Sequence, residues 1–161
     1  MSEQNQLTVA PQVVREEENF VVIQNAEGKF SRKAKYHDYS SITAQSREEK
    51  IWLMNLMEGD EETGNGLKEQ VGKHIVVENI ITRKYDKINE ETGQLEYGVL
   101  TYLITPEKQV FVTSSKNVYM SIIRIMDLFG KPTDSEWENI TVKVMKEKAQ
   151  NGDMIKIKLV G

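Results

Sequence analysis

The chain contains no cysteine among its 161 residues. This absence excludes disulfide bonds, thiol nucleophiles and zinc sites built on cysteine. Histidine is almost as scarce, with only His37 and His74, so a histidine-rich metal site is excluded and a serine–histidine–aspartate triad would need one of these two. Both are read as ordinary surface or half-buried residues. Neither glycine-rich phosphate-binding pattern occurs. We therefore predict a protein that is not an enzyme and that uses no metal and no cofactor.

Long apolar runs are also missing. No stretch of the sequence approaches the roughly 18–20 residues that span a bilayer. The polar N-terminal residues lack the basic and apolar regions of a signal peptide. We expect a cytoplasmic protein without membrane contact.

Positive charge is in deficit over the whole chain, whose formal net charge is −4. Proteins that bind polyanions are usually basic, so this value alone argues against nucleic acid. The charge is unevenly distributed, however. Residues 1–70 carry 8 Lys/Arg against 13 Asp/Glu, a net of −5, whereas residues 71–161 carry 13 against 12, a net of +1. The excess acid therefore lies outside the C-terminal part of the chain.

The N-terminal part is predicted to hold two regions. Residues 1–19 are polar, contain the acidic run 16–18 and are expected to be a disordered tail. Residues 20–70 are expected to form an extension with one helix packed on the domain that follows. Within it, residues 29–41 show no clear period and mix cations with aromatic rings. This stretch is either a nucleic-acid-binding arm or a surface loop docked by its aromatic side chains.

A helix is predicted to begin at Ser46, because Ser46 and Glu49 match the capping-box pattern. Residues 51–57 are densely apolar, so this helix is expected to pack on the domain; a partner-binding helix is the alternative. It is followed by an acidic, glycine-rich stretch, residues 60–66. That stretch lacks the EF-hand pattern and is read as a solvated linker.

Residues 71–161 are predicted to be one β-rich domain. We expect strands at 74–85, 95–104 and 110–113, a helix at 116–129, and a closing hairpin at 140–160 with its turn at Asn151-Gly152. The polar pair 78–79 predicts a bend in the first strand, and Gly98 predicts a bulge or a close backbone approach in the second. The order strand, strand, strand, helix, strand, strand is that of the five-stranded OB-fold barrel. The sequence leaves open which face of the second strand points inward.

Cations and aromatic residues suggest where single-stranded nucleic acid would bind. Aromatic rings stack on bases and cations contact phosphates without reading sequence. The predicted binding residues are Arg83, Lys84, Tyr85, Tyr97, Phe111, Lys143, Lys156 and Lys158, with Arg32, Lys33 and Tyr36 as a clamping arm. The alternative is that the lysines only solvate an exposed strand face and that the rings belong to the core.

Residues 103–106, 110–115, 118–119 and 121–130 together resemble the small OB-fold single-stranded DNA-binding proteins of phages and mobile elements of Gram-positive hosts. The helix at 46–57, the acidic loop and residues 67–72 are also similar to that group, so the resemblance covers about residues 35–161. It implies an OB fold, cooperative or multi-site coverage of single strands, and a role in replication or transfer of mobile DNA. It implies no fixed set of binding residues. The chain differs from bacterial housekeeping proteins of this function because it carries no long acidic C-terminal tail.

We therefore expect a sequence-independent single-stranded DNA-binding protein that protects or organises DNA during phage or mobile-element replication. Expected partners are single-stranded DNA, replication proteins, and further copies of the chain that associate along DNA through the N-terminal tail. The rival hypothesis is a phage or plasmid interaction module that binds a host protein through its acidic surface, without nucleic acid.

Overall fold

The chain forms two structural units, residues 1–36 and 37–161, in a computed structural model that describes residues 12–58, 65–149 and 152–161.

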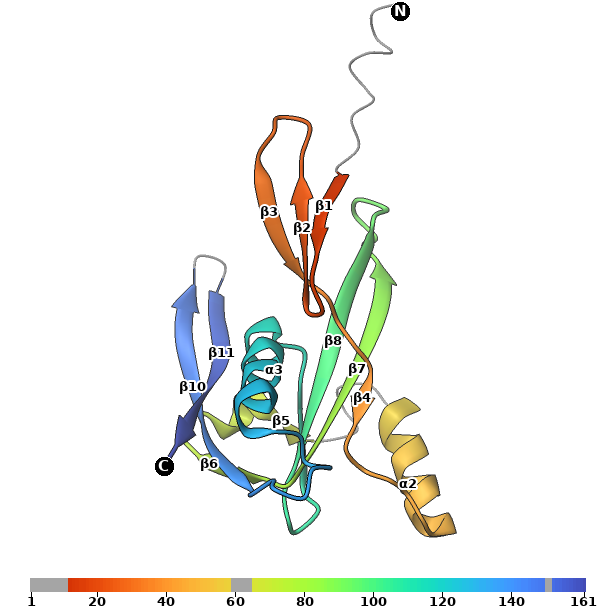
Figure 1. Cartoon of the computed structure of the whole chain (residues 1–161). Helices are drawn as coiled ribbons and strands as arrows, with labels where there is room; N and C mark the ends of the chain where they lie inside the picture. Colours follow the sequence, from red (N-terminus) through yellow and green to blue (C-terminus); the bar gives the residue numbers. More distant parts are fainter. Residues whose placement is uncertain (1–11, 59–64, 150–151) are drawn as a thin grey trace, which may run out of the picture. The chain divides into compact units, whose positions relative to one another are not determined.

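The first unit is a three-stranded antiparallel sheet in the order β1-β2-β3 (Figure 1). Its strands are β1 (Gln12–Glu16), β2 (Phe20–Gln24) and β3 (Phe30–Ala34). The β2–β3 turn is closed by Asn25, whose side-chain oxygen accepts hydrogen bonds from the backbone N–H groups of Glu27 and Lys29, both at 2.9 Å. Gly28 takes the left-handed conformation there, with φ of 82°.

Two expectations for this region need correction. Residues 12–16, expected to be disordered, form a strand because they pair with the apolar strand β2 in an antiparallel register. Residues 30–34, expected to be part of an irregular arm or loop, also form a strand on the other edge of β2. Residues 1–11 of the expected tail lie outside the described residues.

The second unit is mainly β with two α-helices (Figure 1). Its elements are β4 (Tyr39–Ser40), α2 (Arg47–Glu58), β5 (Asn65–Gly66), a 3₁₀ helix (Leu67–Gln70), β6 (His74–Val77), β7 (Asn79–Ile88), β8 (Leu95–Ile104), β9 (Val110–Thr113), α3 (Lys116–Phe129), β10 (Ile140–Ala149) and β11 (Gly152–Val160). They form one sheet in the order β4-β7-β8-β9-β5 and another in the order β11-β10-β6. The predicted order of strands and helix from residue 74 onward is confirmed.

The predicted bend at residues 78–79 is also confirmed, because β6 and β7 are separated at Glu78 and join different sheets. β6 pairs with β10, whereas β7 pairs with β8. The backbone N–H of Glu78 donates to the carbonyl of Ile104 at 2.9 Å, which holds the bend against the end of β8. The strand also continues to Ile88, past its predicted end at Tyr85.

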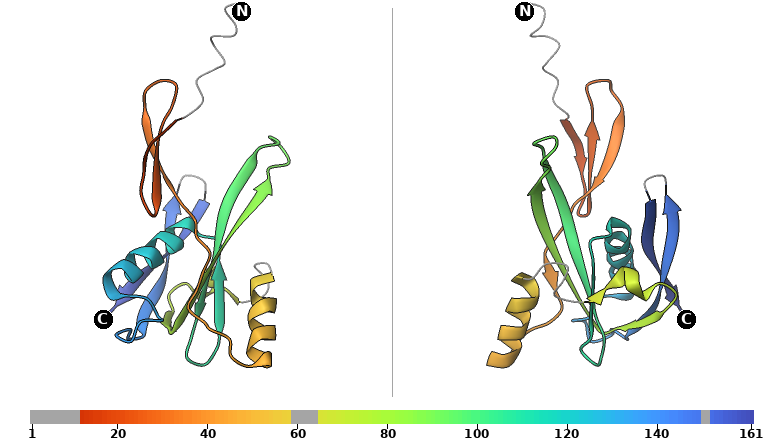
Figure 2. Two further views of the ribbon diagram at one scale, coloured as in Figure 1. Left: turned by 45° about the vertical axis from the view of Figure 1, so that its right-hand side comes forward. Right: turned by 180° about the vertical axis from the view of Figure 1, so that it is seen from behind.

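Helix α3 lies between the β10–β11 hairpin and β8, and α2 lies on the far side of the β7–β8 pair (Figures 1 and 2). Two apolar cores follow from this arrangement. The inner core joins α3 to both sheets and includes Leu103, Val118 and Val142. The outer core lies on the opposite face of β8 and joins Leu100 and Ile104 to α2. From Gly98 to Ile104 both faces of β8 are therefore buried, which answers the question that its sequence left open.

Both helices begin as their sequences predict. The hydroxyl of Ser46 accepts a hydrogen bond from the N–H of Glu49 at 3.0 Å, and the Glu49 carboxylate accepts one from the N–H of Gln45 at 2.9 Å. In α3, the hydroxyl of Ser115 accepts from Val118 at 3.3 Å, and Gly130 ends the helix with a φ of 87°.

The described strands form no closed barrel, since no strand pairing joins β9 to β11 and the two sheets remain separate. The final hairpin is as predicted, with Ala149 paired to Gly152; residues 150–151 of its turn lie outside the described residues. The expected linker at 60–66 is described only from residue 65, in β5. In the part of the chain that the structure describes, no helix is long and apolar enough to cross a membrane.

Candidate functional site

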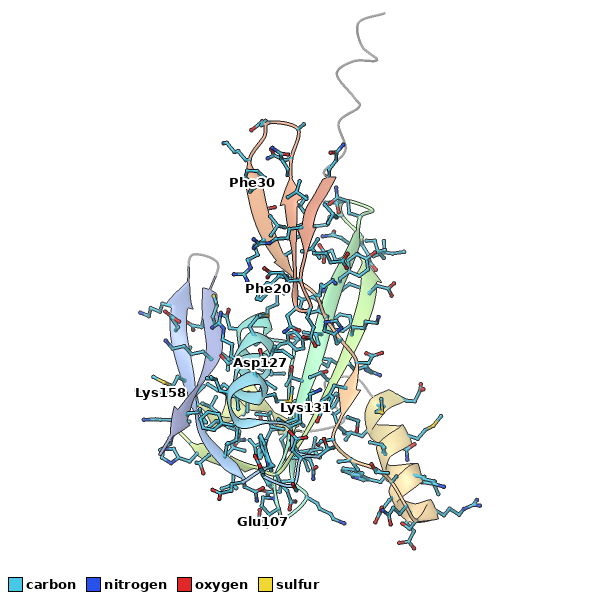
Figure 3. All side chains as sticks on the ribbon, viewed as in Figure 1. Phe20, Phe30, Glu107, Asp127, Lys131 and Lys158 are labelled. Atoms are coloured by element: carbon cyan, nitrogen blue, oxygen red, sulfur yellow. The ribbon has the colours of Figure 1, made fainter. Side chains whose placement is uncertain are left out.

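The sheet of β6, β10 and β11 carries positive side chains on its outer face. The register places Lys143 directly opposite both Lys158 and His74, and Met145 opposite Lys156. Because side chains alternate along a strand, these residues share the face that points away from the inner core. Figure 3 shows Lys158 on the side of the sheet turned away from α3. We call this surface, made of His74, Lys143, Lys156 and Lys158, the lysine face.

The lysine face is only partly neutralised by the chain itself. Among the described residues, the ion pairs of the β10–β11 hairpin are Lys146–Asp153 at 2.8 Å and Lys156–Glu147 at 3.2 Å. Lys143 and Lys158 take part in neither. Like charges directly opposite each other on a sheet are destabilising. An anion bound between Lys143 and Lys158 would relieve that repulsion.

A second surface is the two-stranded ribbon formed by the distal halves of β7 and β8. Arg83, Tyr85 and Lys87 alternate with Lys84 and Asp86, so the two sets occupy opposite faces of the ribbon. The first set shares the face of the outer core, against which Tyr85 packs.

The other face of the ribbon is more apolar. It carries Tyr97, Ile88 and Leu95, which are 65%, 68% and 50% exposed, and Ile88 pairs directly with Leu95. Lys84 lies on this face, and its backbone N–H donates to the side chain of Asp38 at 2.8 Å. Tyr85 and Tyr97, predicted to act together, thus lie on opposite faces of one ribbon.

Tyr85 lies against Gly98, its direct partner on β8. A Cβ atom added at Gly98 would come within 2.5 Å of the Tyr85 hydroxyl oxygen and 2.9 Å of its Cε1 atom. Gly98 was predicted to mark a bulge or a close backbone approach. The register runs past it without a shift, so there is no bulge, and the group that approaches is an aromatic ring.

Phe111 differs from the other predicted residues because it is a core residue. It is 7% exposed and belongs to the inner core together with Leu103, its partner on β8. Its ring therefore has no open face for a base. The alternative considered from the sequence, in which the aromatic rings belong to the core, therefore holds for Phe111.

The predicted arm residues belong to the first unit. Arg32 stacks over the ring of Phe20, with its Cζ atom 3.8 Å from the ring centroid, and forms an ion pair with Glu17 at 3.3 Å. Lys33 follows directly on the same strand, so it points to the other face of the sheet. The structure thus separates Arg32 from Lys33, and Tyr36 lies just beyond the strand.

The comparison with family models decides the identity of the chain. Residues 33–159 match a family described as phage single-stranded DNA-binding protein. The chain belongs to this family. The match includes the whole lysine face and the whole β7–β8 ribbon, and it begins within β3. The strands β1 and β2 precede it.

A curated relative supports the assignment to the phage single-stranded DNA-binding family. The chain is 38% identical over 151 residues to a single-stranded DNA-binding protein of Bacillus phage GA-1, covering 92% of this chain and 88% of that protein. No solved structure matches the chain.

Lys87, His74 and Gly98 were not singled out from the sequence as binding residues. Lys87 joins its surface through the alternation along β7, because it stands two residues after Tyr85, and His74 joins the lysine face through its pairing with Lys143. Gly98 was noted only as a backbone feature. The alternation of β7 identifies Lys87 once Tyr85 is chosen, whereas His74 and Gly98 require knowledge of the strand pairing.

Proposed function

We propose that this chain binds single-stranded DNA without reading its base sequence and covers it during phage DNA replication in the host cytoplasm. Membership of the phage single-stranded DNA-binding family supports the ligand, and the lysine face is the observation that supports the mode of binding. No enzymatic step is part of this proposal.

The lysine face supplies contacts to phosphate. Lys143 and Lys158 are exposed and stand opposite each other, so a phosphate that approaches them gains two cations and lowers their mutual repulsion. Contacts of this kind release counterions and carry no sequence information. They therefore suit a protein that coats DNA of any sequence.

The ribbon supplies base stacking. Tyr85 offers a partly buried ring between two cationic neighbours on the same face, Arg83 and Lys87. Stacking of a base on an aromatic side chain contributes about 1–3 kcal/mol and accepts any base. Tyr97 is the stacking candidate of the opposite face. Phe111 is left out of this proposal because its ring is buried.

The two surfaces lie on different sheets, whose inner faces share one core. Their outer faces are therefore turned away from each other. A strand that contacts both must pass around an edge of the second unit, which lengthens the DNA segment that one protein covers. Fluorescence titration with oligo-dT of increasing length measures that segment.

A salt titration tests the binding proposal. Fluorescence anisotropy of labelled oligo-dT, measured from about 50 to 500 mM NaCl, is expected to show an affinity that falls linearly with salt on logarithmic axes, with a slope near −0.7 per phosphate contact. Duplex DNA and single-stranded RNA serve as competitors. Absence of oligo-dT binding at 50 mM NaCl would reject the proposal in favour of the rival, a module that binds a host protein through acidic surface.

We also propose that the second unit is an OB-type fold. Support comes from the bent β6–β7 strand, which pairs with β8 on one side of Glu78 and with β10 on the other, and from the position of α3 between β9 and β10 in the chain. An experimental structure with DNA bound tests whether β9 and β11 then pair.

Self-association is part of the same proposal. Among the described residues, β1 and β3 form the two edges of the sheet of the first unit and have no further strand paired to them. We propose that this sheet joins copies of the chain along DNA, and that replication proteins are recruited to the resulting complex. Sedimentation velocity of the full chain over a range of concentrations, with and without oligo-dT, measures the association. A monomer under all conditions rejects it.

A further inference from the structure

The contact between Tyr85 and Gly98 carries a consequence for DNA binding. Gly98 is buried in the middle of β8, and glycine weakens a strand interior because it adds no side chain to the packing. A residue with a side chain would therefore be the better strand former at this position. The backbone conformation does not require glycine at this position, since the φ angle of Gly98 is not positive.

The reason for glycine at position 98 is the Tyr85 ring. An added Cβ would stand 2.5 Å from the hydroxyl oxygen and 2.9 Å from Cε1 of Tyr85, distances that real Cβ atoms essentially never show. The ring is planar and turns only about two side-chain bonds, so it moves as one body when an added Cβ displaces its tip. An alanine at position 98 would force the whole ring off β8.

We propose that Gly98 is a positioning residue for single-stranded DNA binding. Because Gly98 has no side chain, the Tyr85 ring can lie on its backbone, and this contact holds the ring in an orientation in which it can stack on a base. The inference rests on the proposed function. A ring with one face on the sheet keeps a fixed orientation, and a fixed stacking group loses less rotational freedom when a base arrives. The flanking cations Arg83 and Lys87 share its face of the ribbon.

The contact also has a purely structural reading, in which an aromatic ring simply covers a strand glycine. That reading predicts that Gly98→Ala changes stability without changing the affinity of the folded protein for DNA. The positioning role predicts instead that Gly98→Ala lowers the affinity of the folded protein for DNA. A double-mutant cycle separates the two, because truncation of Tyr85 removes the atoms that an alanine at position 98 would meet.

The experiment measures the dissociation constant for oligo-dT of the full-length protein and of Tyr85→Ala, Gly98→Ala and the double variant, each shown to be folded by circular dichroism. Tyr85→Ala and Gly98→Ala are each expected to weaken binding by roughly 5- to 150-fold. The double variant is expected to bind like Tyr85→Ala alone. Gly66→Ala is the matched control, since among the described residues a Cβ at this β5 position meets only the Lys68 Cγ at 4.0 Å.

Three results would overturn the inference. Gly98→Ala could bind like the wild type; it could weaken binding equally in the presence and absence of Tyr85; or Tyr85→Ala could bind like the wild type. In each of these cases the wild-type protein still binds oligo-dT, so the proposed function survives. Failure of the wild type to bind oligo-dT instead removes the function and the inference together.

A second measurement covers the case in which Gly98→Ala does not fold. A ring that lies on Gly98 shifts the NMR resonances of its two Hα protons, and Tyr85→Leu retains an apolar cover without a ring. We expect the shift to be lost in Tyr85→Leu, together with at least a fivefold loss of affinity for oligo-dT. Unchanged Hα resonances, or unchanged affinity, would contradict the positioning role.

Discussion

Lys143 and Lys158 face each other directly across the β10–β11 hairpin, and neither takes part in the two ion pairs of that hairpin among the described residues. This pair gives the first prediction. Lys143→Gln should bind oligo-dT more weakly, with a salt slope shallower by about 0.7. The same change should stabilise the free protein by roughly 0.2–0.5 kcal/mol, because it removes a like-charge pair that solvent partly screens.

Lys143→Gln should lower the affinity for DNA and raise the stability of the free protein, and this combination distinguishes Lys143 from an ordinary surface lysine. Lys50→Gln on α2 removes the same charge from an exposed position of a helix. It should change neither the salt slope nor the affinity appreciably. A Lys143→Gln protein with an unchanged salt slope would remove the lysine face from the DNA-binding surface.

Phe111 and Tyr97 give a second prediction, because one ring is 7% exposed and the other 65%. Phe111→Ala should destabilise the protein by about 3–5 kcal/mol, since it opens a cavity in the inner core. Tyr97→Ala should change the free energy of unfolding by less than about 0.5 kcal/mol. Urea unfolding followed by tryptophan fluorescence measures both. Similar losses for the two variants would contradict the assignment of Phe111 to the core.

The sequence predicted correctly those elements whose stabilising contacts lie within the element or next to it. α3 was predicted with its observed bounds because its apolar spacing and both of its caps, Ser115 and Gly130, lie within the helix or next to it. The final hairpin carries its own turn signal in the same way. β1 was missed because its residues gain a partner only by pairing with β2, and the acidic run beside them is typical of disorder. Barrel closure equally depends on a pairing between distant strands.

The candidate site was less predictable than the fold. The alternation of side chains places Arg83, Tyr85 and Lys87 together, and this much follows from a period of two. The opposite orientation of Tyr97 depends on the register between β7 and β8. A shift of one residue in that register would have exchanged its face, and the connection at residues 89–94 is too long for its sequence to fix the register. The burial of Phe111 likewise follows from α3 and the second sheet, not from β9 alone.

Glu49 gives a prediction for acid conditions. The backbone N–H of Gln45, above all, lowers the pKa of its carboxyl below the ordinary value of 4.5. A depressed pKa means that the charged form stabilises the folded state above pH 4.5 and that this contribution is lost as the pH falls through the lower value. The protection factors of the amides in the first turn of α2, which are exchange rates corrected for the intrinsic effect of pH, should therefore fall at acid pH. Glu49→Gln should weaken this pH dependence, and an identical pH profile in the variant would contradict it.

Tyr119 gives the corresponding prediction for alkaline conditions. Its side chain is fully buried, and its hydroxyl accepts a hydrogen bond from the backbone N–H of His37 at 3.1 Å. Burial raises the pKa of this phenol above its ordinary value of 10, and the hydrogen bond from His37 opposes that shift. With a raised pKa, the contribution of the neutral phenol to stability is complete below pH 10 and is lost as the pH rises through the higher value.

Tyr119→Phe therefore separates two effects of one hydroxyl. At pH 7 the variant should lose about 1–3 kcal/mol, because the N–H of His37 is left without this acceptor in a partly buried site. Between pH 9 and pH 11 its urea midpoint should fall less steeply than that of the wild type, since the variant has no phenol to ionise there. Tyr97→Phe is the control, because that hydroxyl belongs to an exposed side chain. Equal alkaline slopes for wild type and Tyr119→Phe would show that ionisation of another group limits stability at high pH, and that the hydrogen bond to His37 acts only through the loss at pH 7.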